Sequence, residues 1–299
     1  MNTLPSTPCY LNGEFTPLCD ARISVMDRGF IFGDGLYEVV PVYAGTPFRF
    51  AQHMARLERS LKEMRIANPC TREQWHSIAL RLIAHGAQSA GVAATEIDQM
   101  VYIQITRGVA MRDHVMPPGL TPTVFAMANV MRIPSAQQRG QGVTCVTAND
   151  FRWEKAHIKA TSLLGAVFAR QISFDADAIE TVMFRNGFLS EAAASNVWVV
   201  NDGKVMGPPK DNLVLEGIRY GLIEEICRKQ GVPFELRRIS RDEVFGADEL
   251  LLSSATKEVL AITTLDGQPI GNLSHRGRPG PVCAKLYAAY QDAKVATAG

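Results

Sequence analysis

The chain has 299 residues and an almost balanced charge, because 31 Lys and Arg stand against 30 Asp and Glu and leave a formal net charge of +1. This balance excludes a protein that holds nucleic acid through a large basic surplus. A hydrophobic content of 46%, with only 20% charged residues, excludes an acidic disordered chain. A chain of this length buries about 75% of its unfolded surface, so we expect a globular protein of two domains.

Cysteine usage and the N-terminal segment both favour the cytoplasm. The six cysteines form no C-x-x-C pair, and their spacing fits neither a disulfide framework nor a zinc site. Residues 1–20 lack the basic start and apolar run of a signal peptide, and no window approaches the about 18 apolar residues of a membrane helix. We therefore expect a cytoplasmic protein without a metal site, a membrane partner or a nucleic-acid partner.

The first half of the chain opens with strand patterns and continues with two helices. Residues 10–15 read as a hairpin around Asn12-Gly13. Apolar residues at helical spacing over 54–64 predict one amphipathic helix, and the capping box Thr71-Arg-Glu-Gln74 begins a second. Strands are expected at 36–43, 100–106 and 123–128.

Residues 132–142 are polar, contain a proline and two glycines, and lack periodicity, which predicts an interdomain linker between domains at 1–131 and 143–299. In the second domain, a hairpin is expected to pair 181–184 with 196–200. Further strands are expected at 143–149, 233–238, 249–253 and 259–264, and helices at 161–174, 217–229 and 280–294. This order favours an α/β (α+β) fold with mixed sheets over one doubly wound parallel sheet.

Two residues suggest chemistry. Lys159 stands where a strand-like segment gives way to an apolar helix, and partial desolvation there would free its amine for Schiff-base chemistry. Glu191 precedes small residues and a buried-looking strand, where an acid can keep a heterocyclic nitrogen protonated. Taken singly, a lysine or a glutamate at such a position is more often a solvated side chain. The sequence holds no G-x-G-x-x-G, P-loop or G-x-S-x-G motif that would favour another chemistry.

The sequence resembles the class IV aminotransferases, which are the pyridoxal-phosphate enzymes of fold type IV. The likeness extends over nearly the whole chain and rests on several motifs in order. The matching segments are Asp27–Glu38, His53–Leu57, 157–171, 190–200, Leu215–Arg219 and Ser253–Glu258. The resemblance implies a two-domain fold, a pyridoxal 5'-phosphate cofactor bound as a Schiff base to Lys159 in the C-terminal domain, and a homodimer with its active sites at the subunit interface.

The resemblance also assigns cofactor contacts. The matching positions are Lys159, Arg56, Glu191, Ser195, Asn196, Ile218, Arg219, Ser254 and Ala255. Arg56 corresponds to a phosphate-binding arginine, and the residues after Gly217 open a helix whose N–H groups suit an anion. Arg219 and Ala255 stand where many relatives carry hydroxyl side chains, and the Ala192–Ala194 run replaces the more common Gly and Ser. The sequence does not decide whether Arg219 faces the phosphate.

Within the family, the likeness is to D-amino acid transaminases, because Arg112-x-His114 matches a pair that binds the substrate carboxylate from the partner subunit. Tyr37 corresponds to a tyrosine that completes this site. The implied reaction is ping-pong transamination of the type D-alanine and 2-oxoglutarate to pyruvate and D-glutamate. The alternatives are an L-branched-chain aminotransferase, an aminodeoxychorismate lyase, and a binding protein that kept the fold without catalysis.

Overall fold

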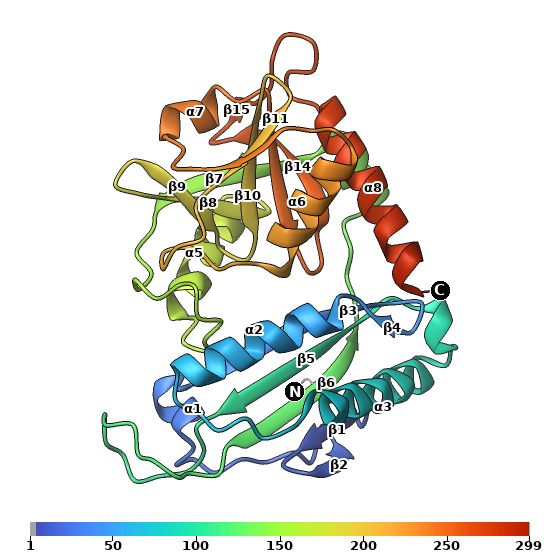
Figure 1. The fold of residues 1–299 in the computed structure, drawn as a ribbon, viewed down its shortest axis with the longest axis vertical. Helices are drawn as coiled ribbons and strands as arrows, with labels where there is room; N and C mark the ends of the chain where they lie inside the picture. Colours follow the sequence, from blue (N-terminus) through green and yellow to red (C-terminus); the bar gives the residue numbers. More distant parts are fainter. Residues whose placement is uncertain (1–3, 299) are drawn as a thin grey trace. The chain divides into compact units, whose positions relative to one another are not determined.

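The computed structural model describes residues 4–298, which form two compact units (Figure 1). Unit 1 contains residues 4–131, Ile158–Leu163 and residues 296–298, and unit 2 contains Arg132–His157 and Leu164–Val295. Mixed sheets combined with helices confirm the expected fold class.

Unit 1 is built on a six-stranded antiparallel sheet in the order β2-β1-β6-β5-β3-β4. The predicted hairpin around Asn12-Gly13 is confirmed, since Tyr10 pairs with Phe15. The strands are β1 (Pro8–Leu11), β2 (Glu14–Pro17), β3 (Gly35–Tyr43), β4 (Thr46–Pro47), β5 (Gln99–Thr106) and β6 (Thr123–Val130).

Every second side chain along the central strands of unit 1 is buried and forms its core. Leu36, Val40 and Val42 of β3 are completely buried with alternate residues of β5 and β6, and they pack against α2 (Phe50–Glu63) and α3 (Arg72–Ala90). Full burial of each such side chain contributes about 1.5–3 kcal/mol. The predicted capping box at Thr71 is confirmed, because Thr71 and Gln74 each accept a hydrogen bond from the backbone N–H of the other.

The segment around Lys159 pairs with β3. Tyr37 N–H donates to the carbonyl of Lys159 over 3.0 Å, Thr161 N–H donates to Gly35 over 2.9 Å, and Ala160 lies opposite Leu36. The short strand β4 pairs only with Val42 and Tyr43 at the other end of β3, which leaves this edge open. Backbone pairing therefore places Lys159 in unit 1, whereas the sequence assigns it to the C-terminal domain.

Unit 2 is built on a nine-stranded mixed sheet in the order β12-β11-β10-β13-β14-β7-β8-β9, with β15 beside β14. The pairs β7·β8, β14·β7 and β11·β12 are parallel, and the others are antiparallel. The strands are β7 (Val143–Asn149), β8 (Glu180–Arg185), β9 (Phe188–Ala192), β10 (Asn196–Asn201), β11 (Lys204–Gly207), β12 (Phe234–Leu236), β13 (Glu249–Ser254), β14 (Glu258–Leu265) and β15 (Gln268–Pro269). The helices are α4 (Ala136–Gln141), α5 (Leu164–Asp175), α6 (Ile218–Lys229), α7 (Arg241–Phe245) and α8 (Pro281–Ala298).

One predicted pairing is wrong. Strand β8 pairs with β9 across the turn Asn186-Gly187, and not with β10, which pairs with β11 and β13. Asn186 and Gly187 both adopt positive φ, as a tight hairpin turn requires, so this dipeptide was the overlooked signal.

The segment 132–142 also differs from an irregular linker, because it contains α4 and belongs to unit 2. A capping box formed by Ser135 and Gln138 begins this helix. The sequence likewise did not predict the short helices α1 (Arg28–Phe32) and α7. No helix within residues 4–298 is long and apolar enough to cross a membrane.

Candidate active site

Lys159 combines partial burial with the absence of a charge partner. Its side chain is half-buried, and Nζ lies 4.1 Å from the centroid of the Tyr37 ring. Among the described residues, no carboxylate lies within ion-pair distance of this amine. An amine that no carboxylate holds in its charged form suits condensation with a carbonyl group.

Arg56 lies in a buried ion pair on the helix-covered face of the same sheet. Its Nε and Nη2 each donate to an oxygen of Glu38 over 2.7 Å, and His53 Nδ1 lies 2.7 Å from Oε2 of that carboxylate. Burial alone would raise the pKa of Glu38, but Arg56 and His53 hold it well below its ordinary value. The guanidinium plane is thus fixed by a bidentate contact.

Replacing Glu38 with Gln should lower the free energy of unfolding at pH 7 by about 3 kcal/mol, because it removes the buried carboxylate that pairs with Arg56. A carboxyl with a lowered folded pKa stabilises the fold above its ordinary pKa of 4.5, and this contribution is lost as the pH falls below that value. The difference between wild type and Glu38→Gln should therefore shrink below pH 4.5. Urea denaturation at several pH values measures this difference in the free energy of unfolding. A difference that grows toward low pH would contradict the stabilising role of the ionised Glu38.

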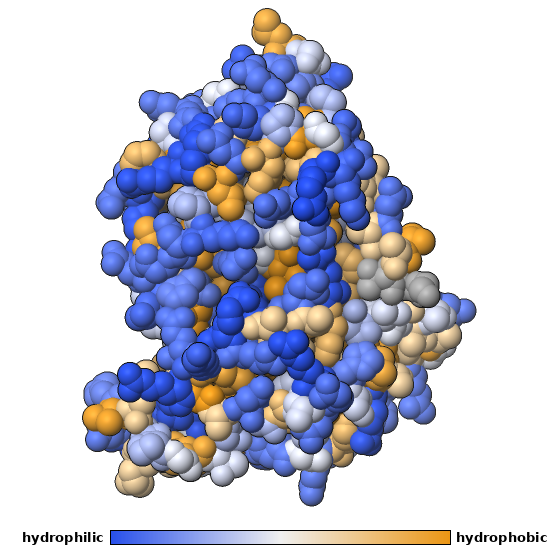
Figure 2. Space-filling model, in the orientation of Figure 1, coloured by the Kyte–Doolittle hydropathy of each residue, from blue (hydrophilic) through white to orange (hydrophobic). Residues whose placement is uncertain are grey.

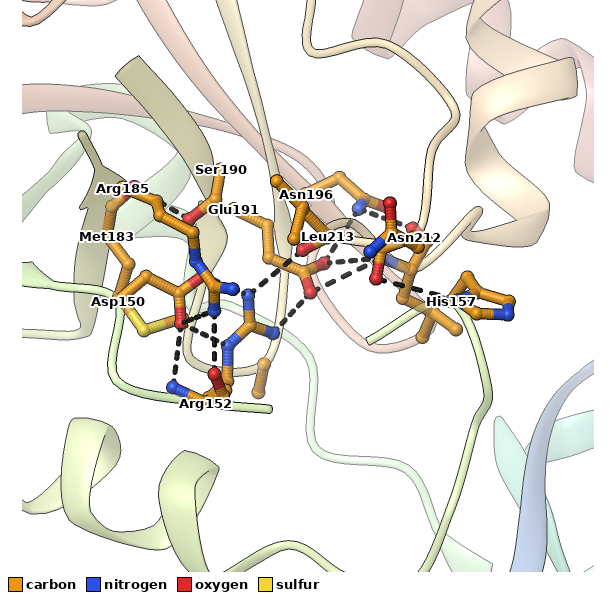
Figure 3. A network of polar contacts seen from close by, with 12 residues as sticks. Asp150, Arg152, His157, Met183, Arg185, Ser190, Glu191, Asn196, Asn212 and Leu213 are labelled. Atoms are coloured by element: carbon orange, nitrogen blue, oxygen red, sulfur yellow. Dashed lines mark hydrogen bonds and ion pairs between the residues drawn. The ribbon is translucent and has the colours of Figure 1, made fainter. Parts of the chain in front are cut away.

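Glu191 lies in a polar network of unit 2 (Figure 3). Arg152 donates through Nη1 to Oε1 of Glu191 and pairs with Asp150 through Nε and Nη2 at 2.9 and 2.8 Å. Asn196 donates through Nδ2 to Oε2 of Glu191 over 3.3 Å, and Leu215 N–H approaches both carboxylate oxygens at 3.3–3.4 Å. The carboxylate is therefore held from two sides.

Burial raises the pKa of Glu191, and the neighbouring Arg152 opposes this effect. The carboxylate is 5% exposed, and Arg152 has a raised pKa although burial acts against its charge. A buried carboxylate with a raised pKa is a stronger proton acceptor than an exposed one. This arrangement suits an acid that shares a proton with a ligand nitrogen.

The N-terminus of α6 lies against the same network. Gly217 is its N-cap, and no side chain caps the helix there. A Cβ at Gly217 would lie 2.2 Å from Oδ1 of Asn196, whose amide is fixed by Glu191 and by the carbonyl of Leu215. Glycine is therefore required for this close approach. The first N–H groups of α6, including those of Ile218 and Arg219, have no partner within the helix and could serve an anion.

The side chain of Arg219 lies against α8. Its Nε and Nη2 donate to the hydroxyl of Tyr290 over 3.2 and 3.0 Å, and both residues are buried. The guanidinium of Arg219 therefore contacts the hydroxyl of a tyrosine in α8, which the sequence alone did not predict. The backbone of Arg219 stays in the first turn of α6.

Glu180 organises two turns of unit 2 that carry predicted site residues. It is completely buried, and Oε1 accepts from the hydroxyl of Ser195 and from Lys257 Nζ, each at 2.8 Å. Ser254 is the last residue of β13 and Ala255 opens the turn that follows, and Ser254 Oγ accepts from Lys257 N–H over 3.1 Å. Ser195 thus contacts Glu180, while its neighbour Asn196 contacts Glu191.

Arg112 and His114 lie on the exposed loop between β5 and β6 in unit 1 (Figure 1). Both contact the ring of Phe32, with the Arg112 guanidinium carbon 5.4 Å from its centroid and the His114 ring centroid at the same distance. Figure 2 shows polar and apolar side chains mixed at the tip of this loop. Within the described residues, neither side chain makes a hydrogen bond or ion pair with Tyr37 or Lys159.

Sequence reasoning did not identify Arg152 as part of the site. It lies seven residues before Lys159 in an irregular segment, and only the fold brings it to Glu191. Tyr102 was also overlooked, although it lies on the face of β5 beside Tyr37, with ring centroids 5.8 Å apart. Burial and the nearby Tyr37 raise the pKa of Tyr102 to about 12, and its hydroxyl donates to Gln104 over 2.6 Å.

Known proteins resemble this chain over most of its length. The sequence model of the family described as Amino-transferase class IV matches residues 35–265. A D-alanine aminotransferase of Bacillus licheniformis is 33% identical over 281 residues, which cover 94% of this chain and 95% of that protein. This chain belongs to the class IV aminotransferases. A D-alanine aminotransferase of Staphylococcus aureus is 32% identical over 283 residues, covering 94% and 96% of the two chains.

Solved structures show the same class IV fold. The branched-chain amino acid aminotransferase of Escherichia coli has a TM-score of 0.83 at 23% identity, with 96% of this chain and 94% of that chain covered. The branched-chain amino acid aminotransferase of T.th., in complex with N-(5'-phosphopyridoxyl)-L-glutamate, has a TM-score of 0.84 at 22% identity, with 98% and 96% covered. At these identities the likeness concerns the fold.

The predicted family and cofactor are confirmed: this class IV enzyme is an aminotransferase that uses pyridoxal 5'-phosphate. The residues present fit that cofactor. Lys159 offers an amine without an ion-pair partner among the described residues, Glu191 offers a buried carboxylate, and the start of α6 offers N–H groups at a glycine N-cap. These three groups match an aldehyde, a ring nitrogen and a phosphate.

Proposed function

We propose that this enzyme transaminates D-amino acids with pyridoxal phosphate, in the manner of D-alanine and 2-oxoglutarate giving pyruvate and D-glutamate. The observation that carries the proposal is the pair of Arg112 and His114 on an exposed loop, because both side chains contact the ring of Phe32 in α1. A guanidinium and an imidazole N–H together bind a carboxylate through charge-assisted hydrogen bonds. The curated relatives of similar length that are named D-alanine aminotransferases support this choice.

The proposed catalytic residues are Lys159 and Glu191. Lys159 would hold the aldehyde carbon of the cofactor through its amine. When free of the cofactor, the same amine would take the proton from the substrate Cα and deliver it to that carbon. Pyridoxal phosphate supplies the electron sink for the negative charge that develops at Cα. Glu191 keeps a proton on the ring nitrogen, which this sink requires.

The remaining predicted residues bind and orient. We assign the phosphate to Arg56, to the N–H groups of Ile218 and Arg219, and to the turn with Ser254 and Ala255. Asn196 holds the Glu191 carboxylate, and Ser195 fixes the turn through Glu180. Tyr37, Arg112 and His114 bind the substrate carboxylate.

We further propose that the enzyme acts as a homodimer in the cytoplasm. The exposure of Arg112 and His114 suits residues that act in a partner subunit, and the six cysteines form no disulfide. If the pair acts in trans, a monomer is inactive, and gel filtration with activity assays across dilution tests this.

The decisive test is the single-turnover reaction of the purified holoenzyme with a panel of D- and L-amino acids, followed by cofactor absorbance. We expect D-alanine to react about 10²-fold or more faster than L-alanine and L-leucine, because only one enantiomer places both the carboxylate and the Cα proton correctly. Fast conversion by L-leucine without conversion by D-alanine would instead support a branched-chain aminotransferase, which is the activity of the two solved structures that share this fold.

A further inference from the structure

Helix α1 (Arg28–Phe32) is fixed to both ends of the loop that carries Arg112 and His114. Its N-cap Asp27 is completely buried and accepts from the hydroxyls of Thr106 and Thr123 over 3.0 and 2.6 Å. Thr106 is the last residue of β5 and Thr123 is the first residue of β6. Helix α1 is thus hydrogen-bonded, through its N-cap, to the residues at which the loop leaves β5 and enters β6.

Arg28 reaches from this helix to the middle of the loop. Its Nη1 donates to the carbonyl of Asp113 over 2.6 Å, and Asp113 is the residue between Arg112 and His114. Among the described residues, 111–122 form no helix or strand. The hydrogen bond from Arg28 therefore holds an irregular segment against helix α1.

The guanidinium of Arg28 is itself held in place. Its Nε donates to Asp34 Oδ2 over 2.8 Å, and Arg107, at the base of the loop, donates to both oxygens of Asp34 at 2.7 and 2.9 Å. Arg28 and Arg107 are each 3% exposed. Burial alone would raise the pKa of Asp34, but the two guanidinium groups lower it, so the cluster stays charged.

Phe32 completes the support. Its ring lies 4.8 Å from the guanidinium carbon of Arg28, and the same ring contacts Arg112 and His114. A cation over an aromatic face is attracted by the ring, so one ring orders both side chains modestly. Arg28 fixes the backbone between the pair, and Phe32 fixes the side chains.

We propose that Arg28 and Phe32 are positioning residues, which hold Arg112 and His114 in the arrangement that binds the substrate carboxylate. This role rests on the proposed function, because that function assigns the binding of the substrate carboxylate to Arg112 and His114. Both residues act through the Arg112–His114 pair.

The test uses the holoenzyme variant Arg28→Met, in which Asp34 keeps Arg107 as its partner. We expect the KM for D-alanine to rise about tenfold, as the loss of a hydrogen bond from a charged group implies, with kcat changed less than about threefold. The reaction with ethylamine, which lacks a carboxylate, should not change. Arg81→Met is the matched control, because Arg81 lies over the ring of Phe15 in the same unit and its loss should alter neither reaction.

A double variant separates positioning from general destabilisation. If Arg28 acts through Arg112, then Arg28→Met combined with Arg112→Met should be no worse than Arg112→Met alone. Additive losses, or an equal loss with D-alanine and ethylamine, would overturn the proposal. Phe32→Leu supplies a second variant, with the same expected pattern at a smaller, about threefold, increase in KM.

Hydrogen exchange keeps this inference separate from the proposed function. In the unliganded holoenzyme, the amides of Ala110 and Val115, which donate to Met26 and to the Asp113 side chain, should exchange about tenfold faster in Arg28→Met than in wild type. Unchanged exchange would overturn the support of the loop by Arg28 even if D-alanine is a substrate. Failure of the wild type to convert D-alanine would overturn the proposed function and leave the exchange result standing.

Discussion

Replacing Lys159 with Ala should reduce transamination by about 10⁴-fold or more, because it removes both the Schiff-base amine and the group that moves the Cα proton. The half-buried amine lies beside Tyr37 and pairs with no carboxylate of the described residues, so its removal leaves no charge unbalanced. Wild type should yield a borohydride-reduced adduct on the peptide that contains Lys159, and the variant should yield none. Steady-state rates and peptide mass spectrometry measure both effects.

Lys155→Ala is the matched control. Lys155 is an exposed lysine in the same irregular segment, and its replacement should leave the rate within about twofold. A Lys159→Ala enzyme that keeps more than about one hundredth of wild-type activity would show that another residue does this work. A reduced adduct on Lys155 would lead to the same conclusion.

Replacing Glu191 with Gln should slow the single-turnover reaction by about 10²- to 10³-fold at neutral pH. An opposite charge shifts the pKa of a neighbouring group by about 1–3 units, so loss of the carboxylate should lower the pKa of the ring nitrogen by a comparable amount. Gln keeps the shape, and Arg152 keeps Asp150 as its partner, so the fold should persist. Circular dichroism and thermal unfolding confirm folding before rates are compared.

The pH dependence distinguishes this role from a loss of structure. On the proposed role, Glu191 keeps the ring nitrogen protonated across the neutral range in wild type, whereas in Glu191→Gln the protonated fraction should fall tenfold for each pH unit above the lowered ring pKa. The rate deficit should therefore grow with pH and shrink in acid. A deficit that is constant with pH would contradict the assignment.

Glu154→Gln is the control for this series, because it changes an exposed carboxylate near Arg185 at the edge of the same network. Its rate should match wild type at every pH. A response equal to that of Glu191→Gln would mean that the network as a whole, and not the ring nitrogen, sets the rate.

Local patterns in the sequence determined most helices and strands. The capping box at Thr71 and the turn at Asn12-Gly13 are short-range signals, and the structure has both. Polar spacing cannot show whether a short helix forms, so α4 in 132–142 was not predicted. The pairing of β8 was wrong because a more distant strand was chosen over the neighbour across Asn186-Gly187.

For the candidate site too, local motifs were predictable from the sequence and long-range contacts were not. Motif order identified Lys159, Glu191, Arg56 and the α6 N-terminus, because these residues recur along one chain in a recognisable sequence. Side-chain partners depend on distant segments, so the contact of Arg219 with Tyr290 was not predictable.

By itself, the sequence determined the family, the cofactor and the fold class, since these depend on motifs and periodicity that are local in the chain. Only the tertiary structure decided that Lys159 adds to the open edge of β3, that Arg152 reaches Glu191, and that Arg28 ties the loop at Asp113. Each of these contacts joins segments whose meeting depends on how the whole sheet is assembled. Hydrogen bonding and burial across such distances are properties of the packed chain, and no window of sequence contains them.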